Sequence, residues 1–213
     1  MRVLQMIDLL RIGGAQKLVE TFALHAASYD MQASVLSLHD DPQSPIQQAL
    51  RDAGVEVFLF PAPHLLDAGR LRALAAHFRA RRYDVVQTHL AYANILGGLA
   101  GRWTGTPVVA TLHSVGQDPR FHHPLRRALE TWTLRYAARA VVAVGGEVAR
   151  AHTHRLGRKR IEVIPNAVPE IPPLSLQERR ALRSQLGCTP ENVVLIAVGR
   201  LAPPKGYPDL LGA

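Results

Sequence analysis

Cysteine, lysine and long hydrophobic runs are scarce in this sequence of 213 residues. The single cysteine, Cys188, excludes an internal disulfide and fits a reducing compartment. No apolar stretch approaches the roughly 18–20 residues that a membrane-spanning helix requires. The N-terminal segment is short and reaches an acidic residue at Asp8, so we interpret it as a strand and not as a signal peptide. These absences predict a cytoplasmic protein.

Motifs of several enzyme classes are absent as well. The sequence has no G-x-G-x-x-G fingerprint of dinucleotide-binding domains, no Walker phosphate loop and no G-x-S-x-G turn. Two histidine pairs raise the question of a metal. His122 and His123 are adjacent in sequence, whereas His152 and His154 diverge on a predicted helix. No aspartate, glutamate or cysteine completes either pair, so the sequence predicts no metal site.

Positive charge is abundant but unevenly spread. The net charge is +8, and arginine supplies most of it, with 22 Arg against 3 Lys. Residues 119–160 contain ten basic residues against only Glu130 and Glu147, so this segment carries the whole excess. A localised positive field suits an anionic partner, such as a membrane surface, nucleic acid or an anionic substrate. A solvated basic face in an arginine-rich protein explains it equally well.

The order of apolar and amphipathic segments predicts the fold. Short runs rich in Val, Ile and Leu are typical of strands buried on both faces of a parallel sheet. We expect strands at residues 3–7, 33–38, 55–60, 85–88, 108–112, 140–144, 161–164 and 193–198. Helices are expected at about 15–28, 44–53, 67–80, 91–102, 124–137, 146–156 and 176–186. This alternation predicts an α/β protein with a doubly wound parallel sheet.

A proline cluster marks a boundary near the end of the chain. Three prolines fall within residues 169–173, where neither a strand nor a regular helix can continue. We therefore expect one complete domain at 1–168, a linker at 169–175 and the incomplete start of a second domain at 176–213. The final segment contains a strand, a loop and the first turns of a helix.

Three loop features are candidate binding groups. Gly13 and Gly14 lie between the first strand and the first helix, where they would let the backbone approach a ligand beside free helix N–H groups. By themselves they would be explained by a tight turn. His89 and His113 each end an apolar strand, at the edge where ligands bind in open α/β sheets. A neutral imidazole there can bind a sugar hydroxyl or phosphate, or move a proton.

For His113 the position favours function, because a polar residue ending an apolar strand lies where sites form. For His89 a binding role and an ordinary exposed loop histidine stay open. Arg200 and Lys205 follow the last predicted strand and precede a helix. Such a pair of cations suits a diphosphate, since Arg forks onto phosphate oxygens while Lys acts as a mobile point charge. Ordinary surface cations are the alternative.

A basic amphipathic segment occupies residues 120–132. Leu125, Leu129 and Trp132 share a predicted face, flanked by basic residues. The candidates for contact with an anionic membrane surface are Arg120, Arg126, Arg127 and Trp132. A helix that packs on the core with a charged rim is the alternative. If the membrane interpretation holds, the protein would be peripheral on the inner face of the membrane.

Five short motifs occur in one order along the chain and together carry a resemblance. They are Ile12-Gly13-Gly14-Ala15-Gln16, Asp84-Val85-Val86-Gln87-Thr88-His89, Thr111-Leu112-His113-Ser114, Ile164-Pro165-Asn166-Ala167-Val168, and Val198-Gly199-Arg200-Leu201 with Lys205-Gly206. In this order the chain resembles family 4 glycosyltransferases, which are retaining enzymes of the GT-B fold. The resemblance covers essentially the whole chain.

The resemblance implies two Rossmann-like domains that face each other across a cleft. The N-terminal domain would receive a glycan or lipid-linked acceptor, and the C-terminal domain would hold the nucleotide-sugar donor. Gly13 and Gly14 would approach the donor diphosphate, and His113 would contact the transferred sugar. Arg200 and Lys205 would neutralise the leaving diphosphate in place of a metal ion, so no cofactor is expected. The remaining implied substrate-binding residues are His89 and Asn166.

The chain also departs from the family pattern. Two glutamates seven residues apart in the family's C-terminal domain are not found here. We therefore expect the isolated chain to bind donor weakly and to turn over slowly or not at all. Two alternatives stay open: a GT-B nucleotide-sugar epimerase, and a non-catalytic module that binds acceptor or docks on a membrane. Nucleic-acid binding is disfavoured, because no RNP-like or helix-turn-helix pattern occurs.

Overall fold

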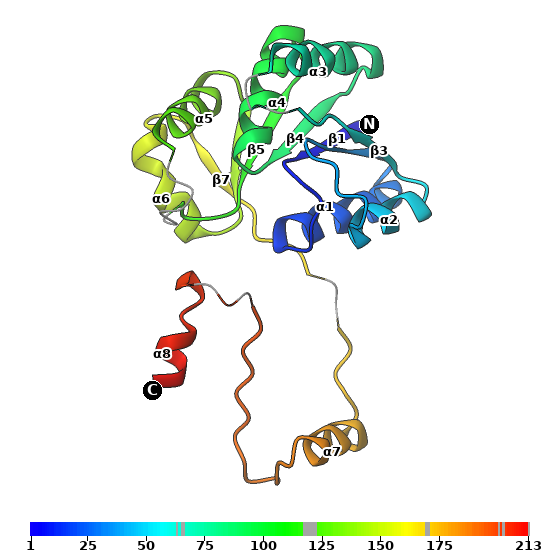
Figure 1. Cartoon of the computed structure of the whole chain (residues 1–213), viewed down its shortest axis with the longest axis vertical. Helices are drawn as coiled ribbons and strands as arrows, with labels where there is room; N and C mark the ends of the chain where they lie inside the picture. Colours follow the sequence, from blue (N-terminus) through cyan, green and yellow to red (C-terminus); the bar gives the residue numbers. More distant parts are fainter. Residues whose placement is uncertain are drawn as a thin grey trace. The chain divides into compact units, whose positions relative to one another are not determined.

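A computed structural model describes residues 1–62, 64, 67–116, 123–168, 171–199, 201 and 203–212. The chain divides into two compact units, Met1–Ala167 and Val168–Ala213, and each is described by itself (Figure 1). Two of the predicted site residues, Arg120 and Arg200, lie outside the described residues.

The first unit is built on one sheet of parallel strands. In chain order they are β1 (Arg2–Ile7), β2 (Gln32–Ser37), β3 (Glu56–Leu59), β4 (Val85–His89), β5 (Val108–Leu112), β6 (Ala140–Ala143) and β7 (Ile161–Val163). Their spatial order is β3-β2-β1-β4-β5-β6-β7, and every neighbouring pair is parallel. Because the chain reverses its direction of progress between β1 and β4, this is the doubly wound arrangement that the sequence predicts.

Helices connect the strands and cover both faces of the sheet (Figure 1). They are α1 (Gly14–His25), which continues into a 3-10 turn at Ala26–Tyr29, α2 (Pro45–Asp52), α3 (Ala68–Arg81), α4 (Ala91–Thr104), α5 (Pro124–Tyr136) and α6 (Gly146–Leu156). Side chains alternate between the faces along each strand. On one face Ile7 and Val35 pack with residues of α1 and α2. On the other, Leu4 and Met6 pack with residues of α3 and α4.

The second unit contains little regular structure. Helix α7 (Leu176–Gln185) begins with a capping box between Ser175 and Glu178, and a 3-10 turn (Pro203–Lys205) and a short helix α8 (Tyr207–Gly212) follow. The strand predicted at 193–198 is wrong, because these residues form no strand and are exposed, Val198 by 93%. A strand needs a neighbour to pair its N–H and C=O groups, and the described part of this unit offers none.

Parallel strands bring all their carboxyl ends to one edge of the sheet. The loops after β1, β4, β5, β6 and β7 therefore meet there, and they contain the predicted Gly13–Gly14 turn, His89, His113 and Asn166. This edge is where open α/β sheets bind their ligands, since it offers free backbone groups and helix N-termini from several loops.

Candidate functional site

The Gly13–Gly14 turn is held in place by contacts on either side of it. Leu10 is fully buried beneath the turn, and Arg11 pairs with Asp41 at 3.0 Å. The Gln16 side-chain amide donates to the Leu9 carbonyl at 3.2 Å, closing the turn from the helix side. The turn itself stays at the surface, with Gly14 exposed.

Gly14 provides space, whereas a Cβ on Gly13 would lie 2.5 Å from Gln16 Oε1, and the turn does not need the conformational freedom of either glycine. The φ of Gly13 is 179°, an extended value open to any residue, and Gly14 is not among the residues with positive φ. Nothing lies within 4 Å of a Cβ placed on Gly14. Helix α1 begins here without a side-chain cap, so its first N–H groups are left for other partners. The local turn explains the glycine at Gly13, and the open, uncapped helix start at Gly14 fits an anion.

His89 and His113 contact each other across neighbouring strands. His89 Nδ1 lies 2.8 Å from His113 Nε2, and His89 Nε2 lies 2.7 Å from Gln5 Oε1. The amide oxygen of Gln5 can only accept, so His89 donates through Nε2 and accepts through Nδ1. His113 must then donate through Nε2. Its Nδ1 keeps a lone pair and has no partner among the described residues, which makes it a hydrogen-bond acceptor for a ligand.

Both imidazoles are neutral at physiological pH. Burial and then the neighbouring His113 lower the pKa of His89 to about 3, and burial lowers the pKa of His113 to about 4. His89 is only 1% exposed, so it is not the ordinary exposed loop histidine that was one of its two alternatives. It supports His113 from beneath.

The histidine pair belongs to a longer polar row on one face of the sheet. Gln5 donates to Gln87 Oε1 at 3.0 Å, and Gln87 donates to Thr111 Oγ1 at 3.0 Å. Gln5 and Gln87 are register partners in β1 and β4, while His89 and Thr111 are partners in β4 and β5. Each buried polar group thus has a partner, which fixes the side chains instead of leaving them to rotate.

Two further residues at this edge escaped the sequence interpretation. Asp8 follows β1 and accepts from the backbone N–H groups of Ala93 at 2.7 Å and Tyr92 at 3.3 Å, so it caps α4. Burial raises the pKa of Asp8 to about 7, against the lowering effect of these two N–H groups. The sequence contains a feature that would have singled out Asp8, because Asp8, like His113, is a polar residue at the end of an apolar strand.

Leu90 is the second of these residues. It has φ 73° and ψ 171°, a region populated almost only by glycine, and it directly follows His89 at the start of α4. Such a conformation costs on the order of 1–3 kcal/mol and persists where its surroundings hold it. Here the hydrogen bonds of Asp8 to α4 and those of His89 to its neighbours hold the two sides of the strained residue.

The proposed membrane-contact residues divide between two environments. Arg126 is half-buried and lies over the Tyr92 ring at 5.5 Å, so it contacts α4. Arg127 is exposed, and Trp132 is 41% exposed. With Arg135 and Tyr136 they line a surface cavity of about 490 Å³ along α5. Helix α5 packs on the core, as the alternative interpretation holds, through the fully buried Leu134 and Thr133, whereas Leu125 is 66% exposed and lies outside that contact.

Asn166 and Lys205 are the remaining described residues among the predicted site residues. Asn166 is exposed after β7, at the far end of the same sheet edge. Lys205 belongs to the second unit, where its aliphatic stem lies 3.7 Å from the Cβ position of Gly199. The roles of Asn166, Lys205 and Arg200 in substrate binding stay predictions.

Within the described ranges, no group of three His, Cys, Asp or Glu side chains is arranged to hold a metal ion. None of the helices that the structure describes combines the length and the apolar character of a membrane-crossing segment.

Comparison with solved structures places the fold among GT-B proteins. An Anabaena protein, HepE, solved in complex with UDP, superposes with a TM-score of 0.70 at 21% identity, covering 88% of this chain and 50% of that one. Sucrose-phosphate synthase from Thermosynechococcus elongatus superposes with a TM-score of 0.71 at 16% identity, covering 100% of this chain and 59% of that one. At these identities the likeness concerns the fold alone.

Sequence comparison identifies the family. D-inositol 3-phosphate glycosyltransferase of Mycobacterium marinum is 33% identical over 156 residues, which are 68% of this chain and 32% of that protein. A 2-deoxystreptamine glucosyltransferase of Streptomyces kanamyceticus is 31% identical over 139 residues, 58% of this chain and 36% of that protein. The chain thus spans about a third of the length of these relatives. The model of Glycosyltransferase Family 4 matches residues 12–170, and the chain belongs to this family.

Proposed function

We propose that this chain forms the acceptor-side part of an enzyme that transfers a sugar from a nucleotide-sugar to a hydroxyl group with retention of configuration. The observation that carries the proposal is that two groups lie at the same edge of the sheet. The open, uncapped start of α1 suits a diphosphate, and the Nδ1 lone pair of His113 suits a sugar hydroxyl. The acceptor would be a glycan or a lipid-linked sugar, and the enzyme would act in the cytoplasm.

Relatives of this chain support the choice of substrate class. HepE has been solved with UDP, with UDP and glucose, and with UDP-glucose, and the relatives named above are glycosyltransferases. A nucleoside diphosphate-sugar carries a doubly anionic diphosphate next to a polyhydroxylated ring. Gly14 leaves room for the first group, and the neutral His113 can accept a hydrogen bond from the second.

The leaving diphosphate needs positive charge as the glycosidic bond breaks. Lys205 and Arg200 are the proposed source of this charge. In a retaining reaction the departing phosphate oxygen takes the proton of the attacking hydroxyl on the same face of the sugar. His113 then orients the ring and stays neutral throughout, consistent with its lowered pKa of about 4.

The test is a transfer assay on the protein of the complete reading frame with a panel of nucleotide-sugars, the product anomer being read by NMR. Gly14→Val fills the open space and should raise the donor KM, whereas Ala80→Val, at an exposed position near the C-terminal end of α3 and away from the carboxyl edge, is the control. His113→Ala should lower kcat by ~10–100-fold, and the exposed His154→Ala should not. Transfer that survives both Gly14→Val and His113→Ala would rule the proposal out.

Membrane contact is a second candidate, favoured by one observation. Leu125, Trp132 and Tyr136 are 66%, 41% and 61% exposed on one basic helix, and amphipathic aromatic side chains beside arginine are typical of bilayer surfaces. Co-sedimentation with anionic vesicles should fall for Trp132→Ala. It should be unchanged for Trp103→Ala, because that exposed tryptophan lies on α4 beneath Arg79. Equal binding to neutral vesicles would exclude this candidate.

A further inference from the structure

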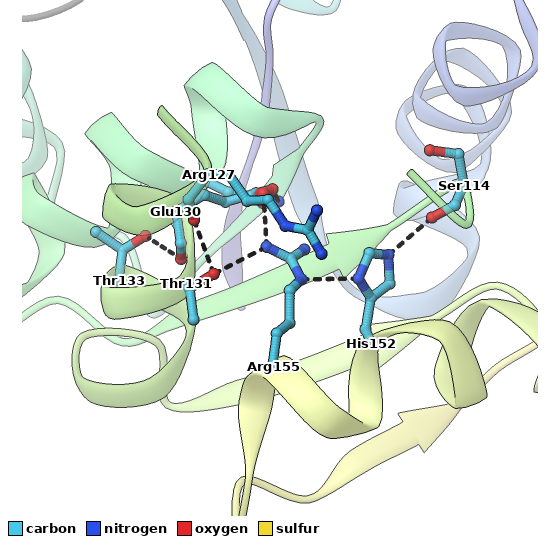
Figure 2. Close-up of polar contacts among 8 residues, drawn as sticks. Ser114, Arg127, Glu130, Thr131, Thr133, His152 and Arg155 are labelled. Carbon is cyan, nitrogen blue, oxygen red and sulfur yellow. Dashed lines mark hydrogen bonds and ion pairs between the residues drawn. The ribbon is translucent and has the colours of Figure 1, made fainter. Parts of the chain in front are cut away.

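The segment that follows His113 is held by a histidine of another helix. His152, on α6, lies 2.8 Å through Nε2 from the carbonyl oxygen of Ser114 (Figure 2). The Cε1 atom of the same ring lies 3.6 Å from the Cβ position of Gly116, which has φ +72°. His152 is only 7% exposed. One imidazole thus contacts the first and the third residue after His113.

The protonation state of His152 follows from its two partners. Arg155 donates through Nε to His152 Nδ1 at 2.8 Å, and a guanidinium has no acceptor to offer. Nδ1 must therefore carry the lone pair. The proton lies on Nε2, which donates to the Ser114 carbonyl. Only the neutral Nε2–H tautomer makes both hydrogen bonds.

Arg155 is itself anchored on α5. It pairs with Glu130 at 2.9 Å, with side chains 11% and 13% exposed, and it donates to Thr131 Oγ1 at 3.2 Å (Figure 2). Glu130 also accepts from Asn94 of α4 at 3.3 Å. Asn94 in turn accepts from Thr88, the neighbour of His89 in β4, at 2.7 Å. A continuous set of polar contacts therefore joins the end of β4 to the segment after β5.

We propose that His152 and Arg155 are positioning residues, which hold the segment 114–116 and thereby set the place of His113. The inference rests on the proposed function, in which His113 orients the transferred sugar. His113 is then fixed from two directions: His89 beneath its ring and His152 on the backbone that follows it. Without the second contact the imidazole can move relative to His89, and the sugar loses a defined partner.

The charges around His152 make its hydrogen bond with Arg155 sensitive to pH. Arg155 of α6 and Arg127 of α5 oppose a proton on its ring, whereas Glu130 of α5 and the Ser114 carbonyl favour one. Burial, the largest effect, lowers the pKa of His152 below its usual value. Protonation at acidic pH would place a second cation against Arg155 and remove the acceptor at Nδ1, so the hydrogen bond from Arg155 should be lost while Nε2 still donates to the Ser114 carbonyl.

NMR of the 213-residue chain tests this without any transfer reaction. His152→Leu removes both hydrogen bonds, and we expect altered imidazole signals of His113 and ~10-fold faster amide exchange in segment 114–116. His152→Gln keeps an N–H donor near Ser114 and should restore much of the wild-type pattern. His154→Leu, an exposed histidine on the same helix, should change nothing.

If the His152→Leu variant does not fold, Arg155→Lys tests the same set of contacts. The lysine keeps a positive charge near Glu130 but has no Nε donor for His152, so the ring should take up a proton at higher pH. Unchanged His113 signals in a folded His152→Leu variant, or an unchanged titration of His152 in Arg155→Lys, would overturn the inference. Neither outcome would affect the proposed function, which the transfer assay tests separately.

In the transfer assay, the kinetic effect of substituting His152 should distinguish a positioning role from a purely structural one. His152→Leu should lower kcat by ~10–100-fold and leave the donor KM nearly unchanged, because the diphosphate contacts at α1 persist. His152→Gln should recover part of kcat. An equal loss of kcat in both variants, or a loss confined to KM, would contradict a positioning role.

Discussion

The two units of the chain differ in what they bury, although the same residue types occur in both. Residues 1–167 bury Leu4, Met6, Leu96 and many others completely, whereas no described residue of 168–213 is buried. An apolar run such as 193–198 is as rich in Val, Leu and Ile as β1 or β5. An apolar run is therefore not sufficient to form a strand, because a parallel strand is stable only between neighbouring strands and beneath helices.

Local structure forms in both units, whereas non-local structure forms in one. Helix α7 has its full capping box, with the Ser175 N–H donating to Glu178 at 2.9 Å and the Glu178 N–H to Ser175 Oγ at 3.2 Å, and it needs no distant residue. The strands of the first unit pair with partners tens of residues away.

Acid should destabilise the first unit and leave the second unaffected. His89 and His113 have pKa values of about 3 and about 4 in the folded chain against 6.5 when unfolded. Between these values only the unfolded chain binds the protons, so the free energy of unfolding falls as the pH falls from 6.5. At about 1.4 kcal/mol per pH unit and histidine, the pair loses ~6 kcal/mol by pH 4. Asp8 opposes this loss, because its pKa of about 7 in the folded chain lies above its unfolded value and the folded chain takes up that proton first; it regains ~3 kcal/mol, so the net loss is ~3 kcal/mol.

Denaturant unfolding followed by tryptophan fluorescence measures this loss, because both tryptophans, Trp103 and Trp132, belong to the first unit. His113→Gln should make the dependence on pH shallower by about one proton. The exposed His154→Gln is the control. Residues 168–213 contain no histidine, so the NMR signals of α7 should not follow this transition. A flat stability between pH 6.5 and 4 would contradict the neutral, buried histidine pair.

The next largest difference between the units is expected for the same leucine-to-alanine substitution made once in each of them. Leu96→Ala removes a fully buried side chain in α4 and should lower the free energy of unfolding by about 2–5 kcal/mol. Leu195→Ala makes the same change at a residue that is 82% exposed, and the effect should stay within ~0.5 kcal/mol. Urea denaturation of the two variants gives both values. Similar losses would mean that residues 193–198 are buried in solution.

The smallest effect is expected for the cap of α7. Ser175→Ala removes the side chain that accepts the Glu178 N–H, at a cost of ~0.5–2 kcal/mol to this helix. Carbon chemical shifts of residues 176–185 should move toward coil values. Ser184→Ala, within the same helix, should raise its helix content slightly because alanine is the better helix former. The fluorescence transition of the first unit should be the same in both variants.

Much of the fold could be predicted from the sequence, since helix and strand patterns are local. The seven strands of the first unit and its helices lie within a few residues of their predicted ranges. His113 is predicted as a site residue because a polar residue ends an apolar strand. The same reasoning was not applied to Asp8, and the strand at 193–198 failed because its partners cannot be read from its own residues.

By itself the sequence determined which segments are helices and strands, that the sheet is parallel, and that glycines and histidines gather at its carboxyl edge. Periodicity and strand-end position carry that information within a few residues. Only the tertiary structure decided that His89 is a buried partner of His113, and that Glu130, Arg155 and His152 meet near Ser114. Those contacts join residues 24 to 38 positions apart, and hydrogen bonding across such separations depends on how the elements pack.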